Sequence, residues 1–181
     1  MATQPSDQDT SVVAGMGRPP ERIAPREGQE SVWDYPRPPR VEPVPERLRV
    51  IIDDAVLADT MRGLRVLETA GAPVYYFPEA DVRMERLVPS PHGSFCEWKG
   101  NASYVKYDHA GRRIDNIGWR YLAPSIGYGS IAGYLAFYAG RVDEAWVDDE
   151  LATPQPGRFY GGWVTVRIVG PFKGGPGAAG W

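Results

Sequence analysis

The stretch SFCEWKGNASYVKY, residues 94–107, places the only cysteine of the chain directly before a Trp-Lys-Gly sequence and an alternating apolar segment. Gly100 allows a backbone turn that other residues resist, and Trp98 can anchor such a turn on the domain. We therefore interpret Trp98–Gly100 as a corner that leads into a strand. Lys99 is then either a solvated charge at the rim of the domain or the cation of a small anion-binding site.

The composition indicates a folded domain with many turns. The chain has 181 residues, of which 43% are hydrophobic and 12% aromatic, which is enough for a packed core. With 21 glycines and 18 prolines, we expect short strands joined by turns. The net charge of −3 offers no basic face, so no nucleic-acid partner is expected.

The sequence also bears on the cellular compartment. A single cysteine cannot form an internal disulfide, and the start MATQPSDQDT has neither the basic region nor the apolar core of a signal peptide. No apolar run approaches the roughly 20 residues of a membrane span. We expect a soluble, cytoplasmic protein without a membrane partner.

Four segments follow one another along the chain: a disordered tail (1–28), a proline-rich arm (29–47), a compact β module (48–153), and a C-terminal strand with a Gly/Pro-rich tail (154–181). The prolines of the arm favour a polyproline II conformation. Trp33 and Tyr35 could pin this arm onto its own domain, or the arm could dock onto a partner.

Short apolar runs separated by turn residues predict a mainly β fold. RVII and AVLAD surround Asp53-Asp54, LRVLET and VYYF surround a turn, and ASYVKY and RIDNIGWRY surround the segment 108–111. IAGYLAFY is apolar enough for a central strand, AWVDDELA is typical of a last hairpin, and WVTVRIV predicts one more strand. Along the strand RIDNIGWRY, period two predicts that Ile117, Trp119 and Tyr121 share a face.

One short helix is predicted near residues 78–88. Pro78 suits a first helical position, and Pro89 would end the helix. The apolar residues fall at a helical spacing that would bury one face, namely Ala80, Met84, Leu87 and Val88.

The order of motifs resembles one known family. VLADT, RVLE, YYFP, DVRME, C-x-WKG-x-A-x-Y, GW-x-Y and GY-x-AFY follow one another as in the domain of unknown function 427 family, over about 100 residues. The resemblance implies a β-tent-like fold of small curved antiparallel sheets, whose relatives include zinc-binding and methionine-sulfoxide-reducing proteins. The family is labelled nucleotidyltransferase-like. Longer members hold a second copy of the module, so a function that needs paired modules would require a homodimer here.

The sequence gives little support to metal chemistry. A polymerase-like nucleotidyltransferase needs a Gly-Ser pair followed by two spaced aspartates, but Gly93-Ser94 precedes Phe-Cys-Glu. The adjacent pairs Asp53-Asp54 and Asp148-Asp149 fall in predicted turns. Cys96 and two histidines cannot supply the four ligands of structural zinc. We predict no metal and no cofactor.

Cys96 is a weak candidate for a catalytic nucleophile. Its thiol would need a lowered pKa and a nearby base or cation, which Lys99, His92 or His109 could supply. A free cysteine at the edge of a strand is more often a small buried hydrophobic residue. Enzyme activity is therefore left open.

The aromatic residues suggest a ligand site instead. Several should line one concave sheet face, as core packing or as the walls of a pocket: Tyr76, Trp98, Tyr104, Trp119 and Tyr121. Polar anchors could come from Arg65, Glu68 and Lys99, although Arg65 and Glu68, three residues apart on a strand, point to opposite faces. We expect a binding module for a small molecule or peptide, the alternatives being an enzyme or an interaction scaffold acting through the arm.

Overall fold

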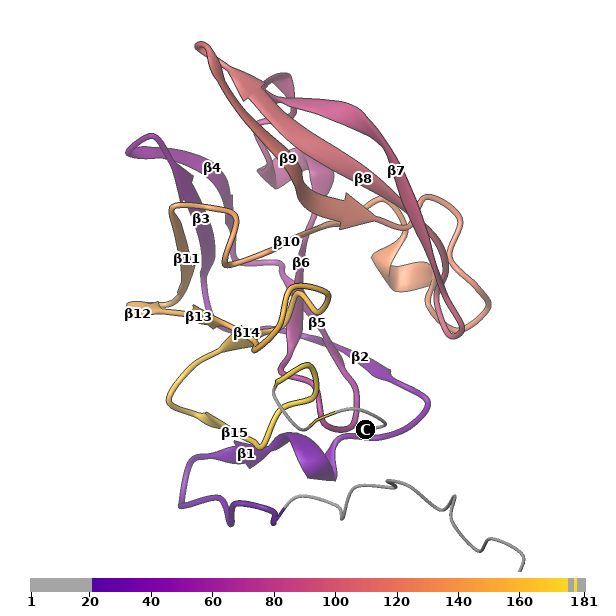
Figure 1. The fold of residues 1–181 in the computed structure, drawn as a ribbon, viewed down its shortest axis with the longest axis vertical. Coiled ribbons are helices and arrows are strands. Elements are labelled where there is room, and N and C mark those ends of the chain that lie inside the picture. The colour runs from indigo at the N-terminus through magenta and orange to yellow at the C-terminus, as the bar shows by residue number, and fades with distance from the viewer. Residues whose placement is uncertain (1–20, 176–177, 179–181) are drawn as a thin grey trace, which may run out of the picture.

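The computed structural model describes residues 21–175 and 178. The disordered tail predicted for residues 1–28 lies for the most part outside this range, as does most of the chain after residue 175. Within it, strands are joined by turns and short 3₁₀ segments, so the prediction of a mainly β protein with small antiparallel sheets is confirmed (Figure 1). No helix of the described residues has the length and hydropathy that crossing a membrane requires.

The largest sheet has seven antiparallel strands, in the order β2 (Arg40–Pro43), β5 (Leu64–Leu67), β6 (Val74–Phe77), β10 (Leu135–Phe137), β9 (Arg112–Arg120), β8 (Gly100–His109) and β7 (Leu87–Cys96). A second sheet has the order β12 (Glu150–Leu151), β11 (Glu144–Val147), β3 (Leu48–Ile52) and β4 (Ala55–Thr60). Two pairs of short strands complete the fold: β1 (Glu30–Ser31) with β15 (Ile168–Val169), and β13 (Thr153–Pro154) with β14 (Trp163–Val164).

The predicted hairpins form as expected. β3 pairs with β4 around Asp53-Asp54, whose backbones both adopt positive φ, and β8 pairs with β9 around Ala110-Gly111. β5 pairs with β6, and β11 pairs with β12. β10 lies between β6 and β9 as a central strand, fully buried along its length.

The segment predicted as one short helix near 78–88 is helical only in part. The segment holds two 3₁₀ turns, η2 (Glu79–Asp81) and η3 (Met84–Arg86), and Leu87 and Val88 already belong to β7. Val82 interrupts the helix with an extended backbone, because it forms a bridge to Ala58 on β4. Pairing with β4 thus outcompetes a helical stripe of only a few apolar residues.

Two further strand predictions need correction. Ile117 does not share a face with Trp119 and Tyr121, because it lies within a bulge of β9, between the paired residues Ile114 and Gly118. Asn116 in this bulge has a φ of 49°. The segment WVTVRIV forms two short strands, β14 and β15, rather than one. The hydrogen bond from Ile168 N to Thr165 O closes a turn between them.

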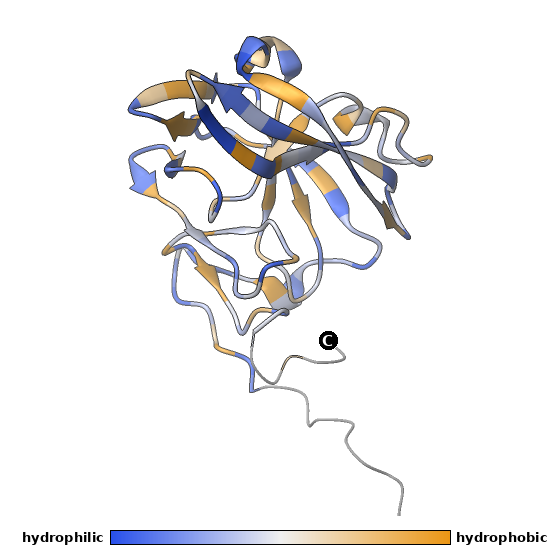
Figure 2. Cartoon of the chain, turned by 45° about the horizontal axis from the view of Figure 1, so that its top comes forward, coloured by the Kyte–Doolittle hydropathy of each residue, from blue (hydrophilic) through white to orange (hydrophobic). Residues whose placement is uncertain are grey.

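Two apolar clusters lie on opposite faces of the large sheet. One fills the space between the two main sheets and includes Phe77, Phe137 and Trp163. The other includes Tyr76 and Trp119. Tyr76 and Phe77 are neighbours on β6, so alternation along the strand sends them to different clusters. In Figure 2 hydrophobic and hydrophilic residues accordingly alternate along the strands.

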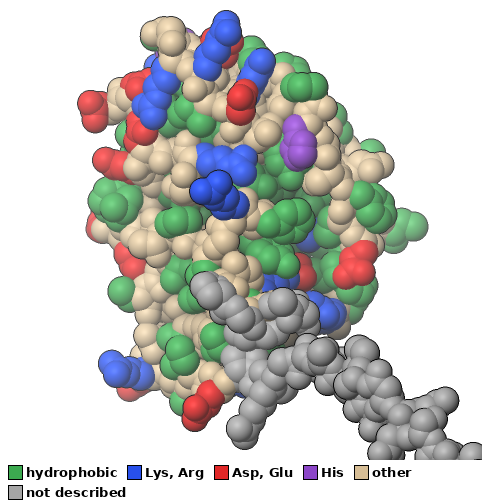
Figure 3. All heavy atoms as spheres, viewed as in Figure 1, with side chains coloured by type: hydrophobic (Ala, Val, Ile, Leu, Met, Phe, Trp, Pro, Cys, Tyr) green, Lys and Arg blue, Asp and Glu red, His purple; other side chains and the backbone are tan. Residues whose placement is uncertain are grey.

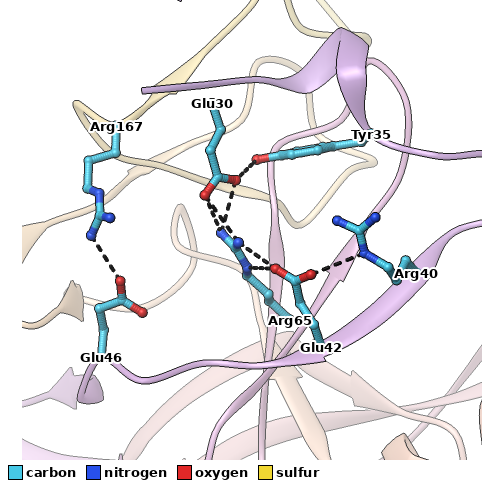
Figure 4. Close-up of polar contacts among 7 residues, drawn as sticks. All are labelled: Glu30, Tyr35, Arg40, Glu42, Glu46, Arg65 and Arg167. Atoms are coloured by element: carbon cyan, nitrogen blue, oxygen red, sulfur yellow. Dashed lines mark hydrogen bonds and ion pairs between the residues drawn. The ribbon is translucent and has the colours of Figure 1, made fainter. Parts of the chain in front are cut away.

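The proline-rich arm packs against its own domain. β2 extends the large sheet beside β5, and Tyr35 is buried. Figure 4 shows how Arg65 joins the two parts, since its guanidinium binds Glu30 and Glu42 while the Tyr35 hydroxyl donates to Glu30. Burial alone would raise the pKa of Glu30, but hydrogen bonds from Tyr35 and Arg65 outweigh it and lower this pKa.

Candidate functional site

A cavity of about 340 Å³ opens on the face of the large sheet that carries the second apolar cluster. Its floor comes from β5, β6, β8 and β9, and the segment 155–173 forms the opposite wall. The view in Figure 3 shows green hydrophobic side chains mixed with blue and red ones right of centre on one face of the molecule.

The aromatic floor follows from strand register. Tyr76 on β6 and Trp119 on β9 both pair with Ala136 of β10, and Trp119 also pairs with Tyr104 on β8. Residues paired in register point to the same face, so these rings form one row with a small residue between two large ones. Trp119 packs edge-on to Tyr76, with ring centroids 6.5 Å apart, and lies 4.6 Å from the ring of Tyr138.

Burial favours the uncharged form of three tyrosines that line the cavity. Burial raises the pKa of Tyr76, Tyr121 and Tyr138 well above the ordinary value of 10. Their hydroxyl groups therefore remain protonated hydrogen-bonding groups. The charge of the cavity comes from lysine, arginine and glutamate side chains alone.

Lys99 is the unusual charge among the lining residues. It is only 7% exposed, and its ammonium group makes no ion pair or hydrogen bond with residues 21–175 or 178. The tight turn predicted at Gly100 is present, with φ of 89°, and the carbonyl of Lys99 accepts a hydrogen bond from Ser125 N. The ammonium lies 5.9 Å from the ring of Tyr128, at the outer limit of a cation–π contact.

Lys173, by contrast, is buried and paired. It is 5% exposed, and its ammonium donates to Glu68 at 2.6 Å and lies 4.9 Å from the ring of Tyr160. Gln155 holds the backbone around this pair, because its amide accepts from Ala72 N and donates to the carbonyl of Lys173. The C-terminal segment is therefore fixed to the turn between β5 and β6 by buried polar contacts.

The same segment lies directly on the indole of Trp119. A Cβ atom added to Gly161 would come within 2.1 Å of the Trp119 ring. The Tyr138 hydroxyl donates to the carbonyl of Phe159 at 3.4 Å. Phe159 and Phe95 line the cavity although each is 73% exposed, so both lie at its mouth.

Most of the residues proposed from the sequence come together here. The lining includes Glu68, Tyr76, Trp98, Lys99, Trp119 and Tyr121, together with Cys96. Arg65 does not line the cavity, because β5 directs it to Glu30 and Glu42. Sequence reasoning missed Lys173, Gln155, Tyr160 and Gly161, although the flank FYGGW…GPFKGG holds the aromatic and glycine residues of a close backbone approach.

Cys96 has no histidine beside it in the cavity. The thiol is half-buried at the end of β7, and neither His92 nor His109 belongs to the lining residues. The ring of His92 packs on Tyr104, whereas that of His109 packs on Tyr107. Over residues 21–175 and 178, no three His, Cys, Asp or Glu side chains are grouped in a way that could hold a metal ion.

Fold and site together define a mainly β domain with an aromatic cavity, in which Lys99 is buried and has no ion-pair partner within the part of the chain that the structure describes. The profile of the domain of unknown function family DUF427 matches residues 40–148, so the chain belongs to this family. The match runs from β2 to the turn after β11 and leaves the C-terminal wall of the cavity outside it. A sequence search of curated proteins gives no match.

Proposed function

We propose that this protein binds a small organic molecule in the cavity above Trp119. The observation that carries the proposal is a cavity of about 340 Å³ in the middle of an aromatic cluster, with a buried lysine on its wall. This volume lies at the lower end of the range of small-molecule sites, about 300–1,000 Å³. Aromatic residues that served packing alone would be expected to fill this space with one another, whereas here they line a cavity that is open at its mouth.

The shape of the site favours a small molecule over a peptide. The segment 155–173 covers the aromatic floor, and Phe95 and Phe159 narrow its mouth. An extended peptide needs an open groove or a free sheet edge. The single cysteine supports a further proposal, that the protein works in a reducing compartment such as the cytoplasm.

Neither alternative function has an equally specific feature in its favour. An enzyme that uses Cys96 would need a base or cation beside the thiol, and both histidines lie elsewhere. Lys99 lines the same cavity, but within the described residues it makes no hydrogen bond with the thiol. A scaffold acting through the arm would need it free, whereas β2 is paired with β5. A homodimer remains a proposal that the resemblance to longer family members suggests.

Two fluorescent probes with the same ring skeleton test the proposal: neutral N-phenyl-1-naphthylamine and anionic 1-anilinonaphthalene-8-sulfonate. We expect at least one to bind saturably and to quench tryptophan emission, because Trp98 and Trp119 line the cavity. Val74→Trp should abolish this binding by filling the cavity. Trp146→Phe, on β11 outside the cavity, is the matched control and should leave it unchanged.

Circular dichroism must show that all variants are folded. If neither probe binds the wild-type protein, or if both bind the Val74→Trp variant as well as the wild type, the proposed function is wrong.

A further inference from the structure

We infer that the ligand of this cavity is an organic monoanion, an acid with an apolar or aromatic body whose negative head group pairs with Lys99. The inference rests on the proposed function, because it assumes that the cavity is a binding site. It adds the chemical class of the ligand and its orientation. The argument comes from the charges that line the cavity.

Four of the five charged residues of the lining have a partner or are exposed. Glu68 binds Lys173 at 2.6 Å, and Arg37, whose side chain is 53% exposed, approaches the same carboxylate at 3.9 Å. Glu97 is exposed to solvent. Only Lys99 is both buried and without a carboxylate among the described residues.

A buried ammonium group without a counter-ion is unfavourable. Lysine is almost never buried to this extent unless it is paired, since removing its charge from water costs more than apolar packing returns. The two fully buried side-chain atoms that lack a partner in the described residues are Arg49 Nε and Trp98 Nε1, so the Lys99 ammonium retains some contact with solvent. An anion that enters the cavity would supply the missing partner, and the surrounding aromatic rings would strengthen the attraction by excluding water.

The same inventory argues against other ligand charges. A cationic ligand would find Glu68 already bound to Lys173 by a short hydrogen bond. The other carboxylate of the lining, Glu97, is exposed to solvent, where an ion pair contributes little. A dianion would need two free buried cations. Among the described residues of the lining, only Lys99 is a buried cation without a carboxylate partner. A single negative charge therefore matches Lys99, and the apolar body of the ligand would lie toward Tyr76 and Trp119.

The two probes separate this inference from the proposed function, since they differ by one sulfonate. We expect the anionic probe to bind wild-type protein about tenfold or more tightly than the neutral probe, the ratio that one charge-assisted hydrogen bond supports. Lys99→Met should remove this preference and leave the affinity for the neutral probe within about twofold. Lys106→Met, a half-buried lysine on β8 outside the cavity, is the matched control and should keep the preference.

The outcomes are distinct. Equal affinities for the two probes in wild-type protein, or an unchanged preference in Lys99→Met, would overturn the inference while the proposed function stands. Failure of both probes to bind the wild-type protein would remove the proposed function itself. A preference that disappears in Lys106→Met as well would assign the effect to overall charge rather than to Lys99.

Discussion

Substitution of Gly161 by alanine tests whether the C-terminal segment sets the position of Trp119. The new methyl group would lie 2.1 Å from Cη2 and 2.6 Å from Cζ3 of the indole, closer than any real contact. The backbone of Gly161 does not adopt a positive φ, so the cost is steric and not conformational. The indole cannot swing away freely, because Tyr76 and Tyr138 pack on it.

Overpacking of this kind costs about 1–3 kcal/mol, and we expect the free energy of unfolding to fall by that amount. Urea unfolding followed by tryptophan fluorescence and circular dichroism measures it. Gly129→Ala is the matched control, because its Cβ would meet no atom within 4 Å and its φ is not positive. It should change the stability by less than about 0.5 kcal/mol.

A double-mutant cycle identifies the cause of the loss. Trp119→Phe removes the outer part of the indole that the new methyl group would strike. Gly161→Ala should therefore cost at least about 0.5 kcal/mol less in the Trp119→Phe background than in the wild type. Equal costs in both backgrounds would refute the contact between Gly161 and Trp119 as the source.

Three further substitutions test neighbouring features. Glu68→Ala should lower the free energy of unfolding by about 3 kcal/mol, because it leaves the Lys173 ammonium buried and unpaired. Lys173→Met should lower the free energy of unfolding clearly less. Equal losses of the two variants in urea unfolding would contradict this reasoning. Hydrogen bonds from Arg112 lower the pKa of Asp143, so the stability that this ion pair contributes is present above the ordinary pKa of 3.8 and is lost as the pH falls through the lower pKa of the folded state. Asp143→Asn should therefore make the free energy of unfolding less dependent on pH in the acid range. An unchanged acid dependence would exclude the Arg112–Asp143 pair as its source. Cys96→Ala should keep probe binding within about twofold and cost on the order of 1 kcal/mol. Fast labelling of the native thiol at neutral pH, together with loss of function in a folded Cys96→Ala variant, would instead favour the enzyme alternative.

The local sequence was sufficient to predict a hairpin where turn residues lie between two segments of alternating apolar and polar residues. The hairpins around Asp53-Asp54 and Ala110-Gly111 were predictable for this reason, and so was the corner at Gly100. It failed where tertiary pairing decided the outcome. The local sequence around Val82 predicts a helix, because its bridge to Ala58 on β4 is a tertiary contact. The bulge at Asn116 cannot be predicted from a period-two pattern of apolar residues.

The candidate site divides in the same way. Its aromatic row could be predicted, because β6, β8 and β9 carry aromatic residues whose faces follow from strand periodicity. The partner of Glu68 could not, since Lys173 lies 105 residues further along the chain in a segment without regular structure. Arg65 was proposed for the cavity because the arm that supplies Glu30 and Glu42 had not been placed.

The division between module and flank bears on how ligand choice can vary within the family. The family profile covers the strands of Tyr76 and Trp119 and the turn that holds Lys99. The aromatic floor and the lysine without a partner in the described residues therefore belong to the shared module. Gln155, Gly161 and Lys173 come from the segment beyond residue 148, and they form the opposite wall. A change in that segment would alter the depth and width of the cavity without disturbing a single strand pair of the large sheet. If the cavity binds an anion as proposed, its charge preference would come from the module, whereas the shape of the ligand that it accepts would be set by the flank.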